Sequence, residues 1–139
     1  MSAGMLRSAV VLGLLSCVGP LAIDMYLPAL PAIAGGLDTS VAAVQMTLTV
    51  FFIAFGAAQL IYGPVADQVG RKPPLYFGLA IFIAGSIGCA LAPSIEVLTA
   101  ARFVQGLGAA VVMVIPRAII RDLHTGVEAT RLMALIMLV

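Results

Sequence analysis

Charged side chains are scarce in this chain of 139 residues, of which 9% are charged and 63% are hydrophobic. With a mean hydropathy of +1.19, the chain has too little polar surface to solvate a globular domain in water. A formal net charge of +1 also gives no support for nucleic-acid binding, which requires Lys and Arg clustered on a solvated face. The composition therefore predicts an integral membrane protein.

Residues that bind metals or act as nucleophiles are equally rare, with one His and two Cys in the whole chain. His124 has no partners at ligand spacing, and we interpret Cys17 and Cys89 as small packing residues within separate apolar runs. The sequence also has no Gly-rich loop of the ATP-hydrolysing kind. We therefore expect neither an enzyme nor a cofactor, and in particular no ATPase.

What the chain does contain is long apolar runs, over residues 9–33, 41–66, 74–92 and 95–120. Each is near the ~20 residues that cross the hydrocarbon as a helix. A fifth run over residues 131–139 gives only about two turns and would end in mid-span. The prediction is an all-α membrane protein with about four and a half transmembrane helices.

The first run invites an alternative interpretation as a signal peptide. Arg7 precedes it, and Ala32-Ile33-Ala34 imitates a cleavage site with small residues. The run is too long for an ordinary signal peptide, however, and it carries Asp24. We count it as the first transmembrane helix.

The cations predict the orientation in the membrane. They gather on one side, whereas the opposite loops around Asp38 and Glu96 contain no Lys or Arg. The N-terminus and the loop after the second run are therefore expected in the cytoplasm. The cations of that side are Arg7, Arg71, Lys72, Arg121 and Arg131, with Arg117 close to it.

Two charges remain deep inside the membrane, away from the ends of the predicted spans: Asp24 in the first span and Arg102 in the fourth. Counted inward from the outer ends of their spans near Ile33 and Ile95, at ~1.5 Å per residue, they lie about 13 Å and 10 Å deep. At such similar depths the Arg side chain could meet the carboxylate directly or through water. Protonation of Asp24 would then loosen the pair. A structural ion pair is the alternative, but a charge at this depth costs about 2.5 to 3.5 kcal/mol, which favours use in function.

A segment between the second and third runs, residues 63–72, combines a turn, a carboxylate and two cations. Gly63 is expected to allow close helix approach, and Gly70 to permit a turn that needs positive φ. Asp67 could accept from the N-terminal N–H groups of a partner helix and so latch one conformation. The alternative is that this segment only sets the topology.

The partner of Asp67 stays open between Arg71, Arg117 and Arg121. Residues expected to serve in a latch at the cytoplasmic surface are Gly63, Asp67, Gly70, Arg71, Lys72, Arg117 and Arg121.

Polar or adaptable side chains within the spans are candidates for lining a cavity for a small amphipathic drug. These candidates are Tyr26, Gln45, Gln59, Gln105 and Met113. Small residues are instead expected to allow close packing of helices. These are Gly56, Gly85, Gly106 and Ala110.

Four segments carry a resemblance to the major facilitator superfamily of secondary transporters. Residues 63–72 resemble its signature loop, and 98–110 resemble a fourth-helix motif in which the Arg, here Arg102, is linked to proton transfer. Residues 23–31 and 116–123 are similar to drug:proton antiporters of the bicyclomycin/chloramphenicol resistance (Bcr/CflA) branch. Together with the sequence around them, the resemblance covers residues 12–138.

The resemblance implies a transporter of twelve transmembrane helices in two six-helix halves, of which this chain would be the N-terminal part. It implies export of drugs across the inner membrane in exchange for protons, with a missing C-terminal half as partner. The antiporter motif of the fifth helix would fall beyond Val139, so the direction of transport follows from branch resemblance alone.

Three other interpretations stay open. The first is a proton-coupled metabolite symporter of the same fold. The second is a non-transporting remnant of a truncated gene. The third is a small exporter that works as a dimer of four-helix chains with an acidic residue in the first helix, although the segment 63–72 and the incomplete fifth helix argue against it.

Overall fold

A computed structural model describes residues 3–123 and 126–137, and every regular element in these ranges is a helix. The all-helical fold expected from the sequence is therefore confirmed. Four stretches are long and apolar enough to cross a membrane, over residues 6–36, 41–69, 72–90 and 95–123. The elements are α1 (Ala3–Asp24), η1 (Leu27–Ala29), α2 (Leu30–Gly36), α3 (Val41–Val69), α4 (Lys72–Ala90), α5 (Ile95–Leu123) and α6 (Gly126–Met137).

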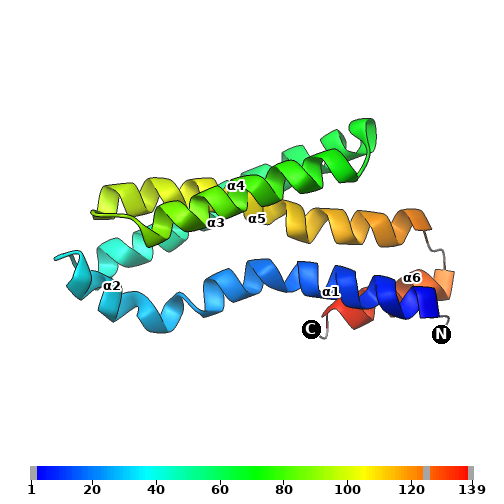
Figure 1. The fold of residues 1–139 in the computed structure, drawn as a ribbon, viewed down its shortest axis with the longest axis horizontal. Helices are drawn as coiled ribbons and strands as arrows, with labels where there is room; N and C mark the ends of the chain where they lie inside the picture. The colour runs from blue at the N-terminus through cyan, green and yellow to red at the C-terminus, as the bar shows by residue number, and fades with distance from the viewer. Residues whose placement is uncertain (1–2, 124–125, 138–139) are drawn as a thin grey trace.

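Helix α5 is the centre of the bundle. Both α3 and α4 pack along it, α1 contacts it from another side, and α6 lies beside α1 (Figure 1). The described parts of the two ends of the chain lie at the same end of the bundle, where α1 begins and α6 lies. Because α5 is enclosed by its neighbours, it contains most of the buried polar side chains.

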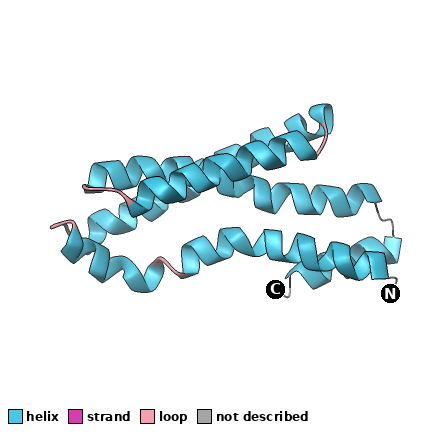
Figure 2. Ribbon diagram, viewed as in Figure 1, coloured by secondary structure: helices cyan, strands magenta, loops and turns pink. Residues whose placement is uncertain are grey.

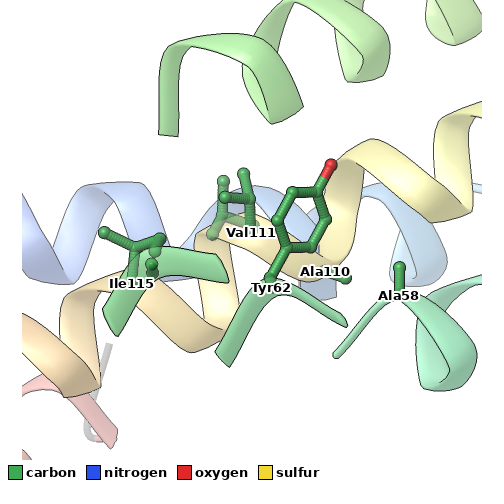
Figure 3. Packing of buried hydrophobic residues seen from close by; sticks show 7 residues of the cluster. Ala58, Tyr62, Ala110, Val111 and Ile115 are labelled. Carbon is green, nitrogen blue, oxygen red and sulfur yellow. The ribbon is translucent and has the colours of Figure 1, made fainter. Parts of the chain in front are cut away.

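The main core lies between α3 and α5, where one aromatic ring packs among small and β-branched residues. Figure 3 shows Tyr62 of α3 beside Val111 and Ile115 of α5. The alanines on both helices allow the two backbones to approach closely, as is usual for helices in membranes. The full cluster is Ala58, Tyr62, Ala66, Ala110, Val111, Val112 and Ile115.

Glycines bring α5 close to both neighbours. A Cβ on Gly106 would lie 2.5 Å from the backbone oxygen of Phe51, and one on Gly85 would lie 2.5 Å from the backbone nitrogen of Gln105. The predicted packing role of Gly85 and Gly106 is confirmed. For Gly56 it is wrong, because a Cβ at Gly56 would have no neighbour within 4 Å among the described residues.

The first span is broken, whereas the sequence predicted one continuous helix over 9–33. Helix α1 ends at Asp24, and a turn with a short 3₁₀ segment leads into α2 (Figure 2). Pro28 and Pro31 have no N–H and cannot donate to the carbonyl groups of Asp24 and Leu27 four residues earlier. The chain instead closes a tight bond from the Tyr26 N–H to the carbonyl of residue 23.

The segment 63–72 is helical for most of its length, although the sequence predicted a loop. Helix α3 continues to Val69, three residues past the predicted end, and only Gly70 and Arg71 separate it from α4. Gly70 adopts φ +88°, so the predicted turn with positive φ is confirmed.

Helix α6 begins at Gly126, five residues before the predicted start at Arg131. Its 12 residues are too short to span the hydrocarbon. His124 and Val139 lie outside the described residues.

Candidate functional site

Arg102 lies inside the bundle, two turns from the start of α5, with only 4% of its surface exposed. Its guanidinium carbon stands 3.5 Å from the centre of the Tyr26 ring and 5.8 Å from that of Phe51. Its Nη1 donates to Gln105 Oε1 at 2.7 Å, while its buried Nε has no hydrogen-bond partner in the part of the chain that the structure describes. Two aromatic faces and one amide oxygen therefore hold this cation.

Gln105 is oriented by α4. Its Nε2 donates to Ser86 Oγ at 2.9 Å, and Ser86 in turn donates to the Phe82 carbonyl at 2.8 Å. Since the hydroxyl proton of Ser86 is used in this way, its oxygen is left to accept, and the amide oxygen of Gln105 must face Arg102. The thiol of Cys89 lies 3.9 Å from the same amide oxygen.

Tyr26 is oriented by α3. Its hydroxyl lies 2.6 Å from Thr47 Oγ1, which donates at 2.7 Å to the carbonyl of Val44. Because the Thr47 proton is committed to that carbonyl, Tyr26 is the donor of the pair. The break between α1 and η1 turns Tyr26 into the bundle, and the bond to Thr47 fixes its ring over Arg102.

Asp24 is placed apart from Arg102. It is the last residue of α1 and is exposed, and it forms no ion pair with any residue that the structure describes. The expected meeting of Asp24 and Arg102 is absent from this conformation, because the break directs Tyr26 rather than Asp24 toward α5. Asp24 is nevertheless only two positions before Tyr26, whose ring covers the cation.

The remaining cavity candidates do not join this cluster. Met113 lies eleven residues after Arg102 on α5, which is about 16 Å along the helix. Gln45 is exposed and Gln59 is half-buried. Of the predicted cavity residues, the structure brings together Tyr26, Arg102 and Gln105.

A pocket of about 390 Å³ borders this cluster and extends to the end of the bundle where α2 and α4 end. We call it the Arg102 pocket. Its wall combines the Tyr26 ring and the Arg102 side chain with Cys89 and apolar residues such as Ile33, Leu37 and Leu98.

A second charged site lies at the opposite end of α5. Arg71 Nη1 is 2.7 Å from Asp67 Oδ1, and Arg71 Nε donates to Asp122 Oδ2 at 2.7 Å. Arg71 is thus the partner of Asp67 among the three that the sequence left open, and it also ties the α3–α4 turn to the last turn of α5. The hydrogen bond to Asp122 raises the pKa of Arg71, so its charge is maintained at any physiological pH.

Five of the seven residues predicted for the latch line a cavity of about 400 Å³ at this end, and Gly70 and Lys72 do not. Arg117 and Arg121 lie on its wall, and Arg117 Nη2 is 3.4 Å from the sulfur of Met113. The expected close helix approach at Gly63 is wrong, because no residue that the structure describes would lie within 4 Å of a Cβ there. Gly63 lines the cavity with Asp67, Arg71, Met113, Arg117 and Arg121, while Lys72 is exposed at the start of α4.

Sequence reasoning missed the hydroxyl groups that orient the cluster, Thr47 and Ser86. Each is a small polar residue in an apolar span, and its partner comes from another part of the bundle. Ser86 follows Gly85, whose close contact with Gln105 brings the two helices together, and this Gly-Ser pair was the available signal.

Comparison with known proteins agrees with this arrangement of spanning helices. Residues 12–139 match the family profile described as Major Facilitator Superfamily. The chain is 45% identical over 134 residues to the uncharacterized MFS-type transporter YdgK of Bacillus subtilis (strain 168), covering 96% of this chain and 33% of YdgK. No solved structure matches it significantly.

Two further relatives have names that refer to resistance. A chloramphenicol resistance protein of Pseudomonas aeruginosa is 40% identical over 108 residues, which are 78% of this chain and 26% of that protein. The multidrug resistance protein MdtL of Escherichia coli (strain K12 / DH10B) is 45% identical over 103 residues, 74% of this chain and 26% of MdtL. The chain spans about a third or less of the length of these relatives, and by its match over residues 12–139 it belongs to the Major Facilitator Superfamily.

Proposed function

We propose that this chain is part of a proton-coupled exporter of small amphipathic drugs in the inner membrane, with its N-terminus in the cytoplasm. The observation that carries the proposal is the enclosed charge of Arg102, which has no anionic partner among the described residues, where Asp24 also stands unpaired at the nearby break. A pair of opposite charges kept apart inside a span suits a device that joins and separates them during transport.

In this proposal Asp24 carries the proton. A charged Asp24 is attracted toward Arg102, and protonation removes the attraction. Since the helical hydrogen bonds are already interrupted after Asp24, the segment can shift at low cost. Tyr26, two residues away, would move with it and uncover the guanidinium, so that proton and substrate compete for the same electrostatic site.

The bridge from Asp67 through Arg71 to Asp122 is proposed as the conformational latch. It holds the α3–α4 turn against the end of α5 in the conformation described here. Release of the bridge would let the cytoplasmic ends of these helices separate. Arg117 and Arg121, which line the adjacent cavity, are proposed to offer alternative partners for the two carboxylates.

Drug export is supported by the names of two relatives, a chloramphenicol resistance protein and a multidrug resistance protein. Because the relatives are about three times as long, we propose that a further portion completes the transporter in two halves. Intact mass of the product extracted from its native membrane checks this. A mass near 14.3 kDa would contradict the proposal of a longer transporter and favour a remnant or a small dimeric exporter.

The test of coupling is the substitution Asp24→Asn. The gene is taken from its native source, and the parent and the variant are each expressed in a strain that lacks its own drug exporters. Chloramphenicol resistance should fall to that of the empty vector, because Asn cannot carry a proton. The matched control is Asp38→Asn, a carboxylate in the connection between α2 and α3, which should retain resistance. Wild-type resistance with Asp24→Asn would overturn the proposed coupling.

A further inference from the structure

The Arg102 pocket presents a cation whose hydrogen bonds are incomplete. Of the guanidinium nitrogens, Nη1 is bound to Gln105, whereas the buried Nε donates to nothing. No described residue supplies an anion, since Arg102 forms no ion pair in residues 3–123 or 126–137. A buried charge without a counter-charge is costly, so a bound anion would stabilise this site.

The rest of the pocket suits an apolar body rather than an inorganic ion. Its volume of about 390 Å³ lies within the range of sites for small organic molecules, and a single halide would fill only a small part of it. Ile33, Leu37 and Leu98 supply apolar wall, and Tyr26 supplies a ring. The charge is at one place and the apolar surface extends away from it.

We propose that the Arg102 pocket binds amphipathic organic monoanions, with a carboxylate on the guanidinium and an apolar tail along the wall. The Nε edge of an arginine is one of the two edges from which the guanidinium donates two parallel hydrogen bonds to a carboxylate, and here its Nε has no partner among the described residues. A small rotation of the guanidinium would direct this edge into the pocket while the bond from Nη1 to Gln105 adjusts.

This inference rests on the proposed function, because it names a substrate class for the same transporter. Its physical basis is separate, since it concerns binding to Arg102 and requires neither proton coupling nor a second half. Binding can therefore be tested on the chain as it exists, without a transport assay.

Cys89 provides the reporter, because it lines the pocket and is half-buried. In a Cys17→Ala background it is the only thiol of the chain, and its alkylation by N-ethylmaleimide can be followed by mass spectrometry. The protein would be kept in a neutral detergent at pH 7. The probes are 4-butylbenzoate, 4-butylbenzyl alcohol and 4-butylbenzylammonium, which share one apolar body and differ in charge.

We expect the benzoate to protect Cys89 at concentrations about tenfold lower than the alcohol, because its bonds to the guanidinium are assisted by charge. The ammonium probe should not protect. Equal protection by the benzoate and the alcohol would overturn the proposal, as would the absence of protection by the benzoate.

The variant Arg102→Gln should remove the difference between the benzoate and the alcohol, whereas Arg7→Gln, an exposed cation of α1, should keep it. Protection by the benzoate that survives in a folded Arg102→Gln protein would also overturn the proposal. Circular dichroism reports whether the Arg102→Gln variant folds. If it does not fold, the proposal is decided by comparing how the three probes protect Cys89 in the parent protein.

The two proposals can fail separately. Wild-type resistance of Asp24→Asn together with selective protection by the benzoate would reject proton coupling and retain the anion site. Lost resistance of Asp24→Asn without protection of Cys89 by the benzoate would retain proton coupling and reject the anion site.

Discussion

At the scale of single residues, the absence of a side chain is as important as its presence. Gly106 and Gly108 remove the Cβ atoms that would meet the backbone of α3 and α4, respectively. A Cβ on Gly108 would contact the backbone nitrogen of Phe82. The close approach of α5 to both neighbours brings Gln105 within reach of Ser86 and keeps Arg102 enclosed.

Gly106→Ala should therefore destabilise the bundle. The new methyl group would meet the Phe51 carbonyl at 2.5 Å, and overpacking of this kind costs about 1–3 kcal/mol. The matched control is Gly56→Ala in α3, where the methyl group has open space and the better helix propensity of Ala acts alone. Unfolding by sodium dodecyl sulfate in mixed micelles measures both, and equal midpoints for the two variants would contradict the packing argument.

Site residues could be predicted from the sequence where a polar or charged side chain differs from the apolar residues around it in the same span. Arg102 was identified because a charge in an apolar run is rare, and Gln105 because it is polar in the same run. The hydroxyl groups of Thr47 and Ser86, which bind Tyr26 and Gln105 respectively, were not predicted, since pairing between helices depends on rotation and depth that one sequence does not contain. The predicted pairing of Asp24 with Arg102 is absent for the same reason, because the depth of a residue in the membrane does not tell toward which helix its side chain points.

At the scale of elements, proline acts differently in different helices of this chain. Pro20, Pro64 and Pro116 lie within α1, α3 and α5, which continue through them. The break occurs where Pro28 and Pro31 remove two donors within one turn. Hydropathy predicted the four spans but could not reveal this break, because the residues on both sides of it are equally apolar.

Replacing both prolines, in Pro28→Ala with Pro31→Ala, should join α1 to α2 as one helix. The restored N–H groups can donate to the carbonyl groups of Asp24 and Leu27, so the carbon chemical shifts of residues 24–27 in solid-state NMR should become helical. Tyr26 would then turn and lose its contact with Arg102.

Pro20→Ala is the control for that experiment, because residue 20 already lies inside α1. Its shifts at residues 24–27 should match those of the parent protein. Unchanged shifts in the double variant would mean that tertiary contacts, rather than the missing donors, hold the break open.

At the scale of the whole molecule, the two charged sites lie at different ends of the bundle. The Arg102 pocket reaches the end where α2 and α4 end, and the bridge of Arg71 lies where α3 and α5 end. The excess of Lys and Arg near the bridge predicts that this end faces the cytoplasm.

Cysteine labelling in whole cells tests the orientation. In a background with Cys17→Ala and Cys89→Ala, a membrane-impermeant maleimide should label Glu96→Cys from outside. It should label Gln68→Cys only after the membrane is permeabilised. Both positions are exposed, so burial does not account for a difference between them. The opposite pattern would reverse the predicted topology.

Helix α5 joins these two ends without interruption from Ile95 to Leu123. Arg102 and Asp122 are twenty residues apart on it, which is about 30 Å along the axis. Over such a length a tilt of about 10° displaces the far end by about 5 Å. That displacement exceeds the 2.7 Å between Arg71 and Asp122. In the proposed mechanism α5 would connect the pocket to the bridge, because a rotation too small to disturb its own hydrogen bonds would be enough to separate Arg71 from Asp122.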